Sequence, residues 1–190
     1  LVNLTTINNN FLSYCQNVKT IDLTGCINLQ SFGNSCFNYL HTLKEIIGMK
    51  DLVNLTSIGN YFMSSSYGIE YLDFSDYLPN LTTIGEYFCY YCHALIYINL
   101  SGFTNLTKIG NYTFEYCYSL QHLACTSLVN LEEIPSYFGY YCYGLLSVDF
   151  GETTNVKKIG FDFFYYCYSL KTINLSGFKN VTTIDGCFLQ

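Results

Sequence analysis

The residues best suited to chemistry in this chain are its ten cysteines and three histidines. Cys89 and Cys92 form a C-x-x-C pair with His93 next to it, which is half of a zinc-binding arrangement. A protein zinc site needs two further ligands, and the internal repeat described below already accounts for the position of Cys92. The sequence therefore predicts neither a metal site nor a cofactor.

Five of the cysteines recur at one position of that repeat, namely Cys15, Cys92, Cys117, Cys142 and Cys167. At an inward position Cys behaves as a small hydrophobic residue. Neighbours in a stack would lie about 5 Å apart, within reach of a disulfide. Their Cβ atoms would point in parallel directions, however, and five members cannot pair completely. Free, buried thiols are the favoured prediction, and disulfides are the alternative.

A catalytic arrangement is not evident among the other polar residues. We expect His41, His93 and His122 to lie in different columns of the repeat, without a Ser or Cys partner at a functional spacing. The one acidic pair, Glu132 and Glu133, lies in a variable part of the unit. The chain has no glycine-rich phosphate loop and no zinc-protease motif. These observations predict a protein that is not an enzyme.

The overall composition disfavours further classes of function. The 190 residues are 50% hydrophobic and 18% aromatic, which gives ample material for a core and no disorder signature. The net charge is −6 and all eight basic residues are Lys, so nucleic-acid binding is disfavoured. No stretch approaches the roughly 18 consecutive apolar residues of a membrane span.

An internal repeat with a period of about 25 residues must position these side chains. It begins with an Asn followed by Leu or Val, at Asn3, Asn28, Asn54, Asn80, Asn105, Asn130, Asn155 and Asn180. We expect one continuous solenoid over residues 1–190, built from seven units (3–27, 28–53, 54–79, 80–104, 105–129, 130–154 and 155–179) and a partial eighth (180–190). Because the chain begins at Leu1 and stops within a unit, we also expect it to be part of a longer protein.

Each unit predicts one coil of a stack. Counted from its Asn as position 0, apolar residues recur at positions 1, 4, 8, 15, 18 and 20. Positions 18 and 20 point to one side of a strand and the mostly polar position 19 to the other. This pattern predicts short parallel strands stacked on a concave face. On the convex side we expect turns with short strands or single helical turns.

The run L-x-x-I-G-x-x-x-F-x-x-C-x-x-L-x-x-I-x-L resembles the BspA-like, or Treponema pallidum-type, leucine-rich repeat. The clearest copies span 81–100, 106–123 and 156–175; the weakest spans 28–53, where Leu40 replaces Cys and Gly48 ends the strand. Phe usually stands one position earlier than in the family pattern, and the units are slightly longer. The resemblance implies a leucine-rich-repeat solenoid of a surface-exposed or secreted protein, linked to adhesion and to host or matrix binding, without catalytic residues.

The outward strand positions vary while the framework does not, so they are candidates for recognition. At the centre of this row lie Tyr71, Ile96, Tyr97, His122 and Leu146, bordered by acidic residues and Lys. An aromatic centre with a polar rim is typical of binding interfaces. These five residues are the predicted partner-binding patch, and an ordinary solvated sheet face is the alternative.

Tyrosine is the unusual residue of the chain, with twenty copies. Tyr91, Tyr116, Tyr141 and Tyr166 share position 11 and flank the inward Cys. They predict a ladder that points partly outward. We favour a half-buried cover over the core, and the alternative is a stripe for lateral contact between solenoids.

Eight N-x-S/T sequons occur, of which Asn99, Asn111 and Asn174 do not begin a repeat unit and are candidates for glycosylation. The sequence thus favours a non-enzymatic protein- or glycan-binding module, at the cell surface or secreted. The alternative is an intracellular structural or scaffolding repeat protein that associates laterally in a larger assembly. The identity of the partner is not predicted.

Overall fold

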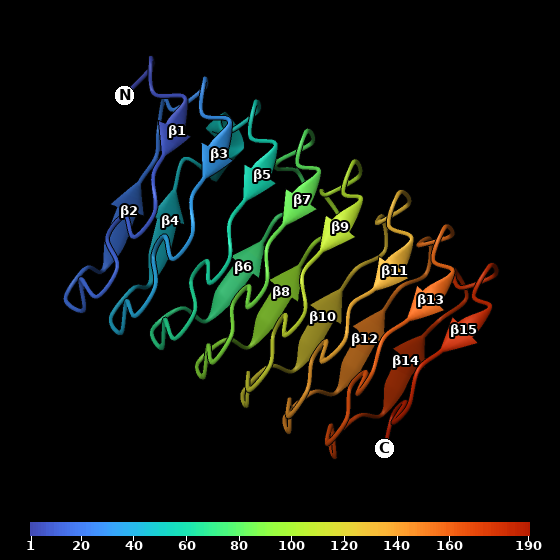
Figure 1. Cartoon of the computed structure of the whole chain (residues 1–190). Coiled ribbons are helices and arrows are strands. Elements are labelled where there is room, and N and C mark those ends of the chain that lie inside the picture. Colours follow the sequence, from blue (N-terminus) through green and yellow to red (C-terminus); the bar gives the residue numbers. More distant parts are fainter.

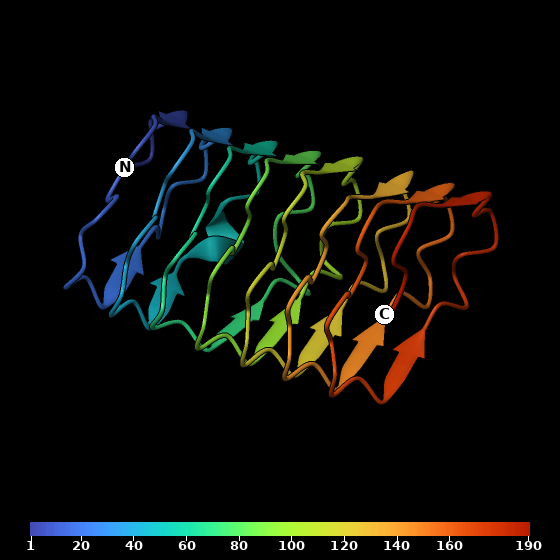
Figure 2. The ribbon, with the colours of Figure 1, turned by 60° about the horizontal axis from the view of Figure 1, so that its bottom comes forward.

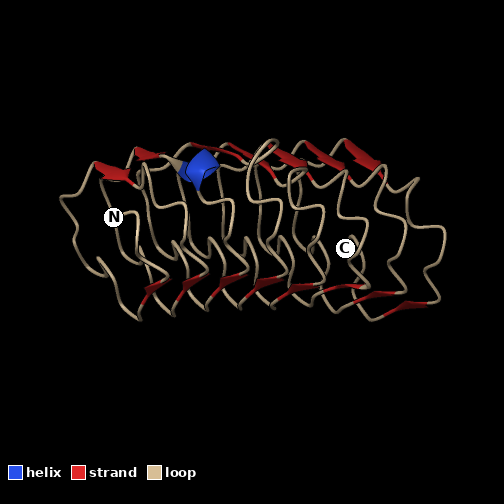
Figure 3. Cartoon of the chain, turned by 90° about the horizontal axis from the view of Figure 1, so that it is seen from above, coloured by secondary structure: helices blue, strands red, loops and turns tan.

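The computed structural model describes residues 1–190, which wind into a rod of stacked coils with the two termini at opposite ends (Figure 1). We number the coils 1 to 8 in the order of the sequence repeats and keep the position numbers counted from each repeat Asn. Strands alternate along the chain between two rows on opposite sides of the rod, as Figures 2 and 3 show. The predicted solenoid of stacked coils with parallel strands is confirmed.

One row consists of seven three-residue strands, which we call the long-strand face. They are β2 (Thr20–Asp22), β4 (Glu45–Ile47), β6 (Tyr71–Asp73), β8 (Tyr97–Asn99), β10 (His122–Ala124), β12 (Ser147–Asp149) and β14 (Thr172–Asn174). All pairs are parallel, in the sheet order β14-β12-β10-β8-β6 and in a separate pair β2-β4. Within β8, Ile98 is buried while Tyr97 and Asn99 lie at the surface. The alternation at positions 17 to 19 therefore gives the predicted strand.

The other row, the short-strand face, consists of eight two-residue strands. They are β1 (Thr6–Ile7), β3 (Ser31–Phe32), β5 (Ser57–Ile58), β7 (Thr83–Ile84), β9 (Lys108–Ile109), β11 (Glu133–Ile134), β13 (Lys158–Ile159) and β15 (Thr183–Ile184). They pair in the order β1-β3-β5-β7-β9 and, separately, β11-β13-β15. The only helix is the short 3₁₀ turn η1 (Met49–Asp51), and no helix has the length and hydropathy to cross a bilayer.

A third backbone ladder joins the coils between the two faces, at positions 7 to 11. There the residues at positions 7, 9 and 11 have left-handed backbone angles, for example Tyr112, Phe114 and Tyr116 with φ of 62°, 60° and 60°. Their N–H groups point alternately to the next and to the previous coil: Tyr116 donates to the Tyr140 carbonyl at 2.9 Å and Phe114 to the Phe88 carbonyl at 3.0 Å. The segment therefore consists of turns, as predicted, and contains no helical turn. Its N–H groups form an alternating ladder with the two neighbouring coils.

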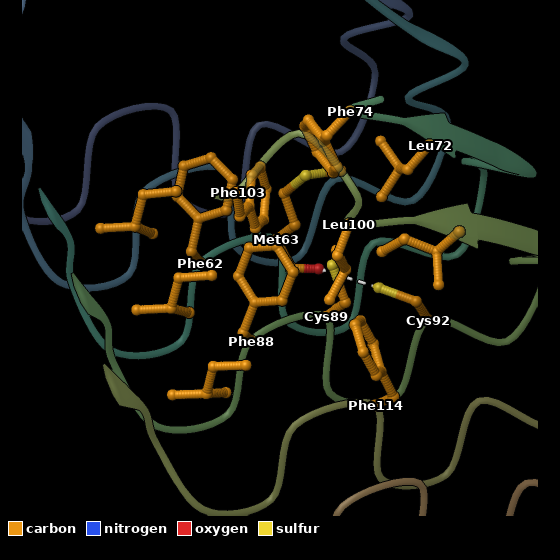
Figure 4. Packing of buried hydrophobic residues seen from close by; sticks show 14 of the residues in the cluster. Phe62, Met63, Leu72, Phe74, Phe88, Cys89, Cys92, Leu100, Phe103 and Phe114 are labelled. Atoms are coloured by element: carbon orange, nitrogen blue, oxygen red, sulfur yellow. Dashed lines mark hydrogen bonds between the residues drawn. The ribbon is translucent and has the colours of Figure 1, made fainter. Parts of the chain in front are cut away.

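The core is a single cluster of 48 buried residues that runs along the rod between the faces. Figure 4 shows Phe side chains of neighbouring coils in contact: Phe88 meets Phe114 face to edge and stacks almost parallel to Phe62, with ring centroids 5.8 and 5.9 Å apart. Both position 8 and position 9 point inward, so Phe is found at either: Phe88 is at position 8, and Phe114 is at position 9. This explains why Phe stands earlier than the family pattern in most coils.

The Asn that opens a repeat unit binds backbone, and its partner is the carbonyl of the residue just before the Asn of the preceding unit. The Nδ2 of Asn105 donates to the Pro79 carbonyl at 2.8 Å, and that of Asn130 to the Thr104 carbonyl at 2.8 Å. The same bond recurs for Asn28, Asn54, Asn80, Asn155 and Asn180. A fixed Asn in each repeat therefore joins neighbouring coils along one edge of the rod.

Candidate functional site

The predicted patch lies on the long-strand face, and pairing of the strands brings its members together. Tyr71, Tyr97 and His122 are direct neighbours in one row, because β6, β8 and β10 pair in register. Tyr71 is 62% exposed, and His122 Nδ1 lies 2.7 Å from the Ser147 hydroxyl. Ile96 and Leu146 precede β8 and β12 and are half-buried beside this row. Tyr71, Tyr97 and His122 thus form a contiguous row, while Gln121 separates Ile96 from Leu146 at position 16.

The patch ends at a break in the sheet that the sequence analysis did not include in the site. No strand pairing joins β4 to β6, and a hollow of about 140 Å³ opens there, lined among others by Ile46, Met49 and Tyr71. An exposed ion pair between Lys44 and Glu70, at 2.8 Å, bridges its rim. The sequence does indicate this break, because the unit 28–53 is the weakest repeat copy and Gly48 stands there in place of the usual strand residue.

The polar residues at position 19 of the long-strand face serve the turns that follow the strands. The Asp73 carboxylate accepts the Ser75 N–H at 2.9 Å, and Asn99 Oδ1 accepts the Ser101 N–H at 3.0 Å. Side chains of Asp and Asn commonly form such local bonds at turns. These bonds fix the ends of the strands.

Tyr91, Tyr116, Tyr141 and Tyr166 do form the predicted half-buried ladder, with ring centroids 4.7, 5.1 and 4.6 Å apart. A second ladder runs beside it at position 13: His41, Tyr67, His93, Tyr118, Tyr143 and Tyr168. The expectation that His41 and His93 lie in different columns is therefore wrong, because both stand at this same repeat position and stack on the two faces of Tyr67. Burial lowers the pKa of His93.

A third aromatic ladder, at position 7, was not found from the sequence. Tyr61, Tyr87, Tyr112 and Tyr137 stack almost parallel, with centroid separations of 4.4, 4.6 and 4.6 Å. The recurrence of these tyrosines at one position of four successive repeats is the signal that would have revealed it. Together the three ladders place most of the tyrosines in contact with a ring of a neighbouring coil.

Comparison with known families agrees with this architecture. A family model described as the BspA-type leucine-rich repeat region matches six copies in the chain, over residues 2–96 and 82–190. The chain belongs to the BspA-type leucine-rich repeat family. Among solved structures it is similar to the leucine-rich repeat protein of T. pallidum, with 19% identity, a TM-score of 0.67, and coverage of 88% of this chain and 72% of that one. No curated protein matches it significantly.

Membership of the BspA-type family supports a general class of function for the chain. Leucine-rich repeats form protein-interaction modules, and the fold is typically non-enzymatic. Side chains of His, Cys, Asp and Glu do not gather in this chain in groups of three or more that could hold a metal ion. Cys92 instead donates from Sγ to the Met63 carbonyl at 3.1 Å, as Figure 4 shows.

All ten cysteines of this BspA-type chain are free; in the repeated column Cys92, Cys117 and Cys142 are also buried, as predicted, whereas Cys15 and Cys167 are only partly buried. Cys117 and Cys142 donate from Sγ to the carbonyls of Cys89 and Phe114 in the previous coils, at 3.0 and 3.1 Å. Burial raises the pKa of both thiols. Because the thiolate is the reactive form, these core thiols act as packing groups.

The three candidate glycosylation residues lie at the surface in different settings. Asn99 and Asn111 are partly exposed, and their Oδ1 atoms accept the N–H groups of Ser101 and Ser136. Asn174 is exposed, but its Nδ2 donates to the Asp149 carboxylate at 2.8 Å. Of the three, Asn99 and Asn111 leave Nδ2, the atom that a glycan would modify, without a protein partner.

Proposed function

We propose that this chain is a non-enzymatic binding module, exposed at the cell surface or secreted, that engages a protein or glycan partner through the long-strand face. The observation that carries the proposal is the contiguous row of Tyr71, Tyr97 and His122, flanked by Ile96 and Leu146. Tyrosine provides a large contact area with a polar tip. Polar residues and the Lys44–Glu70 ion pair border the row, which matches the anatomy of interfaces.

The test uses a Tyr71→Ala, Tyr97→Ala double variant and a panel of purified extracellular-matrix proteins and neutral glycans. For any panel member that binds the wild-type chain, we expect the double variant to lose at least about tenfold in affinity, because central aromatic residues dominate binding energy. The matched control is Tyr143→Ala, Tyr168→Ala, which removes two exposed tyrosines from the side of the rod. Loss of affinity in the control, with retention in the patch variant, would reject the site.

A second function, lateral packing into an intracellular assembly, is favoured by one specific observation. Tyr143 and Tyr168 are the last two members of the ladder at position 13, and they are 39% and 74% exposed. Light scattering over a range of protein concentrations tests it. Association that disappears in the Tyr143→Ser, Tyr168→Ser variant supports lateral packing, and a monomer at every concentration speaks against it.

A further inference from the structure

The short-strand face is interrupted once, between β9 and β11. At the other junctions two backbone bonds join neighbouring coils, from the N–H groups at positions 2 and 5. Between coils 4 and 5, for example, Thr107 donates to the Thr82 carbonyl at 2.9 Å and Gly110 to the Ile84 carbonyl at 3.0 Å. Between coils 5 and 6 both bonds are missing, which leaves the carbonyl groups of Thr107 and Ile109 without backbone donors.

Pro135 is the cause of this interruption. It occupies position 5, where most other coils have Gly, and proline has no N–H to donate. The Gly position is also crowded: a Cβ on Gly110 would lie 2.3 Å from the Glu86 nitrogen, and one on Gly160 would lie 2.5 Å from the Ser136 nitrogen. A proline ring cannot approach the coil below so closely, so coil 6 stands away from coil 5 on this face.

The separation opens a groove of about 780 Å³, which is within the usual size range of ligand sites. Its lining is mostly polar and includes Asn60, Glu86, Thr107, Lys108 and Asn111. The Oδ1 atoms of Asn60 and Asn111 accept the N–H groups of Glu86 and Ser136. Their Nδ2 groups therefore remain available as donors, and the Thr107 and Ile109 carbonyls as acceptors.

The charges in this groove are balanced. Two of its acidic residues, Glu132 and Glu133, form exposed ion pairs with Lys157 and Lys158 at 3.0 and 3.1 Å. Glu86 and Lys108 form none, and their opposite charges offset each other. A cation would meet Lys108 and an anion would meet Glu86, while an apolar ligand would leave the polar lining unpaired, which is unfavourable. The ligand that fits is neutral and both donates and accepts several hydrogen bonds.

We propose that the groove between β9 and β11 binds a neutral carbohydrate. Each sugar hydroxyl donates and accepts, so it can pair with the Asn60 and Asn111 amides as well as with Glu86 and the two free carbonyls. An extended peptide also donates and accepts, but β9 has only two residues on which such a strand could pair. The site lies on the face opposite the patch around Tyr71 and is independent of the proposed partner-binding function.

The experiment titrates maltotriose, cellotriose and chitotriose into the full chain and follows backbone and side-chain amide resonances by NMR. We expect weak binding of at least one trisaccharide, with the largest shifts at the side-chain amides of Asn60 and Asn111. Pro135→Gly restores the residue found in the other coils and should close the groove, which protection of the new Gly N–H from exchange would verify. Binding should weaken at least tenfold in Pro135→Gly and in Glu86→Ala, and stay unchanged in Glu152→Ala, which changes an exposed residue outside the groove lining.

Several results would overturn the proposal. Absence of shifts at Asn60 and Asn111 with all three sugars would do so, as would equal binding by a Pro135→Gly variant whose groove is closed. Stronger binding of spermidine, of a sulfated trisaccharide or of an extended tripeptide at the same amides would assign the groove to another class of ligand. If the new Gly N–H in Pro135→Gly is not protected from exchange, the groove has not closed, and the proposal is then judged by whether Glu86→Ala weakens binding.

Discussion

Replacement of Gly139 by Ala should destabilise the rod by about 2–4 kcal/mol. Gly139 is buried at position 9 with φ of 67°, and a Cβ there would lie 2.3 Å from Cε1 and 2.4 Å from Cδ1 of the Phe164 ring in the next coil. Coil 7 is unusual because Phe163 and Phe164 fill both inward positions. Gly139 provides the space for the second ring. Urea unfolding followed by circular dichroism measures the loss.

A double-mutant cycle separates this steric cause from the backbone angle. Phe164→Leu removes the ring edge, and Leu occupies the same position in coils 1 and 8. The Gly139→Ala, Phe164→Leu chain should therefore be more stable than the sum of the single effects by about 1–3 kcal/mol. Gly25→Ala is the control for the angle alone, since its φ is 77° but the nearest atom to a Cβ is 3.9 Å away. Additive effects in the cycle would contradict the packing explanation.

Glu115→Gln should stabilise the protein by about 3 kcal/mol at pH 8.5 and leave it nearly unchanged at pH 4. Glu115 is 6% exposed, takes part in none of the ion pairs, and has its pKa raised by burial from 4.5 to about 7. The folded protein holds the proton of Glu115 more tightly than the unfolded chain does. The protonated carboxyl therefore contributes fully to the free energy of unfolding at pH values below its pKa in the unfolded chain. This contribution is lost as the pH rises through 7, where the buried carboxyl must ionise. The neutral Gln avoids that loss.

Unfolding free energies of wild type and Glu115→Gln across pH 4 to 8.5 test this expectation. The matched control is Glu152→Gln, which changes an exposed carboxylate in the next coil and should stay within about 0.5 kcal/mol at every pH. A pH-independent difference between wild type and Glu115→Gln would contradict an ionisation effect. Two tyrosines near Glu115 allow a spectroscopic check. The pKa values of Tyr112 and Tyr116 are raised, chiefly by burial and also by nearby charges that include Glu115.

The architecture was predictable because one interaction pattern is repeated in every coil. The Asn at position 0 and the apolar residues at positions 4, 18 and 20 each meet a similar neighbour, so spacing alone predicts which residues share a column. The row of Tyr71, Tyr97 and His122 followed from the same arithmetic. The ladder of tyrosines at position 7 and the shared column of His41 and His93 could have been predicted in the same way, because both follow from the position of each residue in its repeat unit.

What the sequence did not reveal lies where one coil differs from the others. Pro135 interrupts the short-strand face because a Cβ at the Gly found in the other coils would lie only 2.3–2.6 Å from atoms of the previous coil, a closeness that no pattern of apolar residues indicates. Gly139 compensates for Phe164 one repeat later, which requires knowing that both positions 8 and 9 point inward. The burial of Glu115 was hidden because position 10 elsewhere holds Ser, Asn, Tyr or Gln. Exceptions to a repeat need three-dimensional packing to be interpreted.

Native-state hydrogen exchange is the measurement that tests most directly the central claim, a stack of coils joined by three backbone ladders with a defined opening on each face. Slow exchange should recur with the period of the repeat at positions 2 and 5, at positions 7, 9 and 11, and at positions 16 and 20, because these N–H groups donate to neighbouring coils in the three ladders. The Glu132 amide, which lacks its partner in coil 5, should exchange at least about tenfold faster than the equivalent amides of Thr107 and Lys157. Exchange without this periodicity, or equal protection at Glu132, would contradict the account.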